Sequence, residues 1–94
     1  MHPIYKVLSF KIVGPFTLLL RFDDGKNCVI DFKNVLKGNL YGSLSDVNLF
    51  NQVKIDEEIN TIVWPNGADF DPLTLHDWNI YEKDLELLTD SWGK

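Results

Sequence analysis

Cysteine and histidine are scarce in this chain of 94 residues, which has one cysteine, Cys28, and two histidines, His2 and His76. A single cysteine excludes an intramolecular disulfide and a cysteine-rich zinc site, and it makes a reducing compartment the default expectation. The sequence also offers no convincing Ser-His-Asp or Cys-His set of nucleophile and base. We therefore expect that the protein is not an enzyme and uses no cofactor.

Long apolar runs and glycine-rich phosphate loops are lacking as well. No segment approaches the ~18 consecutive apolar residues of a membrane span, and we read no signal peptide at the start of the chain. Gly38 and Gly42 do not follow a strand at the spacing of a nucleotide-binding fingerprint. We therefore expect no membrane association and no nucleotide hydrolysis, and a cytoplasmic location is the simplest expectation.

Basic residues are outnumbered, because 9 Lys and Arg stand against 14 Asp and Glu, which gives a net charge of −5. Residues 1–40 have a balance of +3, from six basic and three acidic side chains, whereas residues 41–94 have a balance of −8, from three and eleven. Nucleic acid is an unfavourable direct ligand for so acidic a chain, since phosphate contacts need a clustered basic face. The carboxylates form either an ordinary solvated surface or a surface for a basic protein partner.

The rest of the composition is that of a globular domain, with 45% hydrophobic and 24% charged residues. A chain of this length can bury one core but not two, so residues 1–94 form a single domain. Period-two alternation predicts three strands, at residues 5–13, 16–22 and 27–32. In the first of them, Leu8, Phe10 and Ile12 share the apolar side. Turn residues between the strands predict an antiparallel meander, in which Gly25 takes a positive φ.

The second half of the chain predicts short elements. A helix is expected at residues 46–52, and a second hairpin at residues 53–56 and 60–64 with the acidic loop Glu57-Glu58-Ile59. Asp71 before Pro72 predicts the start of a single helical turn at residues 72–76, and Asn79 predicts the cap of a C-terminal helix at residues 80–90. The apolar face of that helix comprises Tyr81, Leu85, Leu88 and Trp92. The fold class is therefore α+β, with a small antiparallel sheet, short helices and a C-terminal helix.

Three segments of the chain resemble a known family. They are Phe22-Asp-Asp-Gly25 with Asp31, then Leu49-Phe-Asn-Gln-Val53 with Asp56, and finally Thr61-Ile-Val-Trp-Pro-Asn-Gly-Ala-Asp69. These segments, in this order, resemble the uncharacterised family known as domain of unknown function 2442. The resemblance covers about residues 4–78, and residues 79–94 form a helical extension beyond it. The resemblance implies a small bacterial α+β domain without an assigned activity. Members are often found beside other small proteins, and the resemblance thus implies a toxin–antitoxin-like pair.

These features predict a non-catalytic module that binds a small protein. We expect the contact residues to be acidic side chains of the second hairpin and residues of the following turn, namely Asp56, Glu57, Glu58, Trp64, Asn66 and Asp69. A homodimer formed through the free edge of a strand is a further expectation. The alternative is a metal or small-ligand site made of Asp69, Asp71 and His76, because carboxylates and imidazole are metal ligands.

Overall fold

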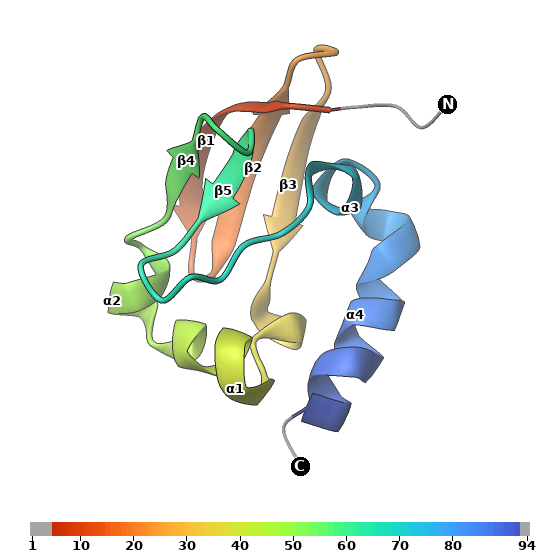
Figure 1. Ribbon diagram of the computed structural model, residues 1–94. Coiled ribbons are helices and arrows are strands. Elements are labelled where there is room, and N and C mark those ends of the chain that lie inside the picture. Colours follow the sequence, from red (N-terminus) through yellow and green to blue (C-terminus); the bar gives the residue numbers. More distant parts are fainter. Residues whose placement is uncertain (1–4, 93–94) are drawn as a thin grey trace.

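The predicted α+β architecture is confirmed by the computed structural model, which describes residues 5–92 apart from the side chains of residues 39 and 88–92 (Figure 1). A three-stranded antiparallel sheet in the order β1-β2-β3 is accompanied by a two-stranded hairpin, β4-β5. No helix in this part of the chain is long and apolar enough to cross a membrane. In chain order the elements are β1 (Val7–Gly14), β2 (Thr17–Phe22), β3 (Asn27–Asp31), the 3-10 turn η1 (Lys33–Val35), α1 (Gly38–Tyr41), the 3-10 turn η2 (Gly42–Ser45), α2 (Val47–Phe50), β4 (Lys54–Asp56), β5 (Thr61–Val63), α3 (Pro72–His76) and α4 (Trp78–Trp92).

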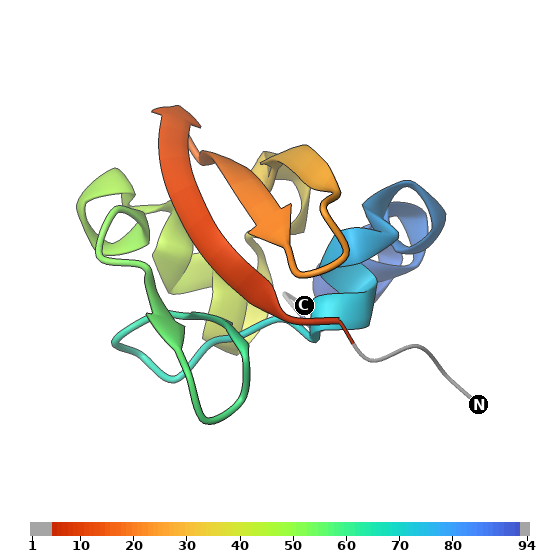
Figure 2. The same ribbon diagram turned by 90° about the horizontal axis from the view of Figure 1, so that it is seen from above.

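The alternation predicted for the second strand places its residues as expected. Leu18, Leu20 and Phe22 of β2 are fully buried, and they face the hairpin and the helices. Ile30 and Phe32 continue this buried face beyond β2. Figure 2 shows that the hairpin and the helices lie on one side of the meander, and that no drawn element covers its other side. The meander is therefore one layer of a two-layer domain.

The apolar face predicted for the first strand is wrong in part. Leu8 is 56% exposed and Ile12 is 39% exposed, while Phe10 is partly buried and Val7 is almost completely buried. The pairing of β1 with β2 shifts register between Val7 and Ser9, and again before Gly14, so simple alternation does not hold along the strand. In addition, β1 is an outer strand of the sheet, which leaves its side chains fewer neighbours.

The core is built around a cluster of aromatic rings. Phe32 has no exposed surface, and its ring lies between 5.2 and 6.0 Å from those of Phe50, Trp64, Phe70 and Trp78. Trp64 Nε1 donates a hydrogen bond to the backbone oxygen of Phe50 at 2.9 Å, which satisfies its buried polar atom. Large rings that directly follow β3 and β5, together with rings from α2, the β5–α3 loop and α4, thus join the two layers.

Two of the three predicted helix starts are confirmed. The Asp46 and Asp71 side chains accept hydrogen bonds from the backbone N–H groups of Asn48 and Leu73, at the starts of α2 and α3. The predicted cap at Asn79 is wrong, because α4 begins at Trp78 and follows α3 after a single residue. Of the face predicted for this helix, Leu85 packs on the core, whereas the side chains of Leu88 and Trp92 lie outside the described residues.

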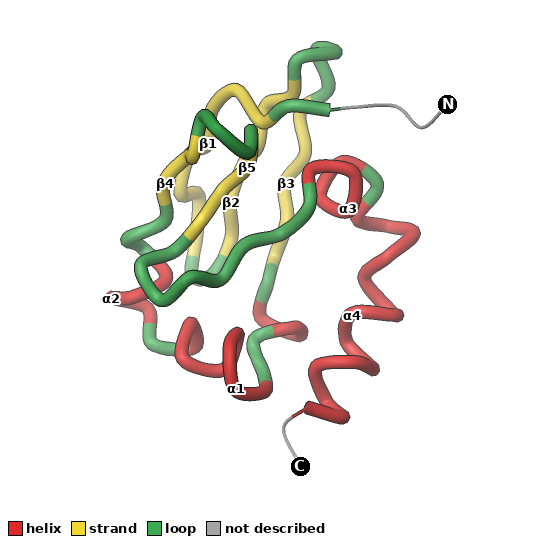
Figure 3. Tube along the Cα trace, viewed as in Figure 1, coloured by secondary structure: helices red, strands yellow, loops and turns green. Residues whose placement is uncertain are grey.

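The long connections, between β3 and α2 and between β5 and α3, consist of short helical turns and loops. The segment between β3 and α2 contains η1, α1 and η2. Figure 3 shows the loop that runs from β5 across the domain to α3. The Pro-Asn-Gly turn at the start of this loop places Gly67 at φ +88°, as a backbone turn of this kind requires.

Candidate functional site

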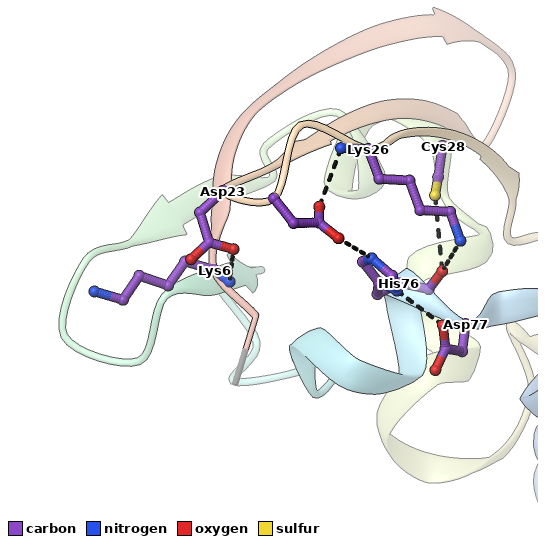
Figure 4. Close-up of polar contacts among 7 residues, drawn as sticks. Lys6, Asp23, Lys26, Cys28, His76 and Asp77 are labelled. Carbon is purple, nitrogen blue, oxygen red and sulfur yellow. Dashed lines mark hydrogen bonds and ion pairs between the residues drawn. The ribbon is translucent and has the colours of Figure 1, made fainter. Parts of the chain in front are cut away.

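A buried histidine joins the two halves of the chain. His76, at the end of α3, is 8% exposed, and its ring contacts two carboxylates. Its Nδ1 lies 2.8 Å from Asp77 Oδ1, and its Nε2 lies 2.7 Å from Asp24 Oδ2 in the β2–β3 turn. Figure 4 shows these contacts. We call Asp24, His76 and Asp77 the His76 cluster.

Neighbouring side chains fix the position of the His76 ring. Tyr5 stacks on it with ring centroids 3.7 Å apart and planes at 2°, and Phe22 meets it edge-on at 5.0 Å. The backbone oxygen of His76 accepts a hydrogen bond from Lys26 Nζ at 2.7 Å and a weaker contact from Cys28 Sγ at 3.8 Å (Figure 4). The β2–β3 turn therefore holds both the ring and the backbone at the end of α3.

Contacts and burial near His76 shift the pKa values of three neighbouring side chains. The pKa of Asp24 is lowered, first by the hydrogen bond from the Lys26 backbone N–H and then by that from His76. Burial raises the pKa of the Cys28 thiol, which keeps it protonated at neutral pH. The pKa of Tyr5 is raised by burial and by the nearby carboxylates of Asp77 and Asp24. A doubly protonated imidazole can donate to both carboxylates, whereas a neutral ring has one N–H only.

The predicted metal or ligand site is not assembled. Asp69 and Asp71 line a shallow pocket together with Ile59 and Pro72, but His76 is not part of it. Instead, both ring nitrogens of His76 are occupied by the carboxylates of its own cluster. Among residues 5–87, whose side chains are described except that of residue 39, no group of three or more His, Cys, Asp or Glu could hold a metal ion.

The comparison with protein-family models settles the relationship of the chain. Residues 7–81 match the family described as "Protein of unknown function (DUF2442)". The chain belongs to this family. The match begins at Val7 and ends inside α4, so it extends three residues beyond the end at residue 78 that the resemblance gave. No curated protein and no solved structure matches the chain.

Among the predicted contact residues of this DUF2442 domain, Trp64 and Asn66 have structural roles. Trp64 is 2% exposed and packs inside the aromatic core, so its side chain cannot contact a partner on the surface of the folded domain. The exposed Asn66 uses its amide group within the chain, where it donates to Leu40 O and Ser43 Oγ and accepts from Ala68 N–H. These bonds hold the turn after β5 against the α1–η2 segment.

The remaining predicted contact residues lie around the β4–β5 turn. Glu57 and Glu58 are exposed in this turn, and Asp56 accepts a hydrogen bond from the Glu58 N–H that shapes it. Ile59, in the same turn, is 45% exposed and lines the shallow pocket that also includes Asp69. We call the group formed by Glu57, Glu58, Ile59, Asp69 and Asp71 the acidic turn surface.

The His76 cluster itself was missed by the sequence analysis. The sequence predicts a turn around Gly25 and a helical turn at residues 72–76, but 52 positions separate Asp24 from His76. No local pattern connects them, because their contact depends on how α3 packs beside the meander. Within this DUF2442 domain the local signal in the sequence is only that a lone histidine lies in a short helical turn, directly before Asp77.

Proposed function

We propose that this DUF2442 domain is a non-catalytic interaction module that binds a small basic protein. The acidic turn surface is the observation that supports this proposal. None of its four carboxylates forms an ion pair with another side chain in the described part of the chain, although Asp71 accepts a backbone hydrogen bond in its role as helix cap. A basic partner would provide the missing opposite charge.

Apolar groups on the acidic turn surface also support the proposed binding of a partner. Ile59 is 45% exposed between the carboxylates, and Pro72 lies at the edge of the adjoining pocket. Interfaces commonly combine an apolar centre with a charged rim, and the rim then contributes mainly to the rate and specificity of association. A partner with Lys or Arg side chains around one apolar residue fits this arrangement.

The geometry of the His76 cluster favours a structural role over a catalytic one. Both ring nitrogens already contact carboxylates, so neither is available to take a proton from a substrate. Cys28, the nearest thiol, points its Sγ at the backbone oxygen of His76 rather than at the ring. We therefore include in the proposal that the domain has no enzymatic activity.

The kind of partner in this proposal rests on the family resemblance rather than on the surface. The resemblance stated above implies toxin–antitoxin-like pairs, and our proposal includes a partner of this kind. The acidic surface itself specifies only that the partner is basic.

Charge reversal on the acidic turn surface tests the proposal. A tagged protein would be used to recover bound proteins from its native cells at near-physiological salt, alongside Glu58→Lys and the matched control Asp84→Lys. Asp84 is exposed as well and lies on α4, and its replacement by lysine changes the net charge by the same amount. We expect a stoichiometric basic partner with the original protein and the control, and its loss with Glu58→Lys. Equal recovery with both variants, or no partner with the original protein, would contradict the proposal.

A further inference from the structure

The outer edge of β1 is open to pairing with another strand. Beyond the ladder with β2, the described backbone hydrogen bonds of β1 include one from Val7 N to Asn60 O and none from residues 8–14. The hairpin β4-β5 contacts β1, but it belongs to a separate sheet, and no described backbone hydrogen bond joins it to the second half of the strand. Ile12 and Val13 are exposed there, at 39% and 47%, and Leu8 in the first half of the strand is 56% exposed. Exposed apolar side chains along an unpaired strand edge favour association with another chain.

The hydrogen-bond pattern identifies which backbone groups are available. Phe22 N donates to Lys26 O and Phe32 N donates to Phe16 O, so the even-numbered residues of β2 bond to β3. Bonds in an antiparallel ladder alternate, and the odd-numbered residues of β2 therefore bond to β1. Their partners are Ser9 and Lys11, which pair with Arg21 and Leu19. The N–H and C=O groups of Phe10 and Ile12 consequently point away from the sheet.

We propose that β1 pairs antiparallel with β1 of a second copy of this chain, with Phe10 on the two-fold axis. In this register Phe10 lies opposite Phe10 of the other copy, and Leu8 lies opposite Ile12. Both of these pairings bring apolar side chains together. The pairing uses the backbone edge of β1 rather than the side chains of the acidic turn surface, although Leu8 and Glu57 line a common pocket. The inference therefore goes beyond the function proposed above.

Charge favours a second copy in this register over other arrangements. Lys11 lies opposite the uncharged Ser9 of the other copy, whereas an axis at Lys11 would place two ammonium groups directly opposite each other. The edge of β3 is less suitable, because Lys26 and Cys28 at its start are engaged with α3.

Amide hydrogen exchange, measured residue by residue in solution at low and high protein concentration, tests this register directly. We expect exchange at Phe10 and Ile12 to slow by about tenfold or more as the concentration rises, because their N–H groups become bonded. Exchange at Ser9 and Lys11, which bond within the chain, should stay the same. Unchanged exchange at Phe10 and Ile12 while the protein self-associates would overturn the proposal, as would a protein that stays monomeric at millimolar concentration.

A pair of matched variants tests the same surface by sedimentation equilibrium. Ile12→Lys should weaken the dimer by about tenfold or more, since it places a charge beside the apolar row. Val29→Lys adds the same charge on β3 at a position that is 66% exposed, and it should leave the dimer unchanged. Equal weakening by both would overturn the β1 pairing. Glu58→Lys should also leave the dimer unchanged, which separates this test from that of the basic partner.

Discussion

His76 Nε2 lies 2.7 Å from Asp24 Oδ2, although 52 positions separate the two residues in the sequence. The contact connects the turn between β2 and β3 with the end of α3, one residue before α4 begins. Lys26, two residues after Asp24, adds a bond to the backbone of the same histidine. The charges of one short turn therefore attach the C-terminal helices to the meander.

A lower pH should weaken the contact between the β2–β3 turn and α3, because it protonates Asp24. Its pKa is lower in the folded protein than the ordinary value near 3.8, so its contribution to stability is complete above that value. The contribution is lost as the pH falls through the lowered pKa, because the unfolded chain then binds the proton more readily. Asp24→Asn removes this carboxylate, so we expect a smaller loss of stability between pH 4 and pH 2 than in the original protein.

Urea unfolding at a series of pH values measures the effect. Asp84→Asn is the control, because Asp84 is exposed on α4 and forms no hydrogen bond in the described structure that its loss would remove. The control should follow the pH dependence of the original protein. An Asp24→Asn protein with the same pH dependence as the control would show that Asp24 does not contribute in this way.

Replacing the histidine should have a larger effect at neutral pH. His76→Ala removes the stacking on Tyr5 and leaves Asp24 and Asp77 without their common partner. We expect a loss of about 2 kcal/mol in the free energy of unfolding, below the usual cost of breaking a buried pair, because both carboxylates can still reach water. Urea denaturation at pH 7 checks the value. A change within about 0.5 kcal/mol, as for an ordinary surface substitution, would contradict the structural role.

Strand alternation in the sequence predicted the centre of the sheet better than its edge. Leu18, Leu20 and Phe22 are buried as their spacing indicated, since β2 has a strand on each side and the second layer over it. Leu8 and Ile12 have the same spacing but remain exposed, because β1 is an edge strand with two register shifts. Period-two spacing shows which side chains share a face of the strand. Burial of that face depends on tertiary neighbours, about which the spacing gives no information.

The residues of the candidate sites also differ in how far the sequence alone predicts their surroundings. The exposed loop Glu57-Glu58-Ile59 could be read from local sequence, and the structure places it in a turn as predicted. Trp64 was expected to be available to a partner, yet nearby rings from distant segments bury it. The contact of His76 with Asp24 likewise depends on tertiary packing, and only the folded chain reveals it.

Trp64→Phe should test how much the core depends on the indole group. The substitution keeps an aromatic ring but removes the hydrogen bond from Nε1 to Phe50 O and leaves a small void. Phe50 O retains the bond from Val53 N, so the carbonyl is not left without a donor. We therefore expect a loss of only about 2 kcal/mol, from one hydrogen bond and part of a side-chain volume.

Denaturant unfolding followed by circular dichroism measures this change independently of tryptophan fluorescence. Trp78→Phe is a suitable comparison, because Trp78 is 7% exposed and contacts the same Phe32 ring. An unaffected midpoint for Trp64→Phe would show that the indole N–H and the lost volume make no net contribution.

The turn after β5 allows a test of backbone conformation separate from packing. Gly67 has φ +88°, and a methyl group added there would meet no atom within 4 Å. Gly67→Ala should therefore lose about 1–2 kcal/mol of stability from backbone strain alone. Gly42→Ala is the matched control, because Gly42 has the helical φ of −60° and ordinary contact distance to Lys37.

We expect Gly42→Ala to be neutral or to stabilise the fold by up to about 1 kcal/mol, since alanine restricts the unfolded chain without straining the folded one. Thermal or urea unfolding of both variants provides the comparison. Gly67→Asn should fall between them, because asparagine adopts the left-handed conformation more readily than alanine. If alanine were tolerated equally at both glycines, the turn would not require the positive φ, and the Trp64-Pro-Asn-Gly67 segment would need another physical reason for its sequence.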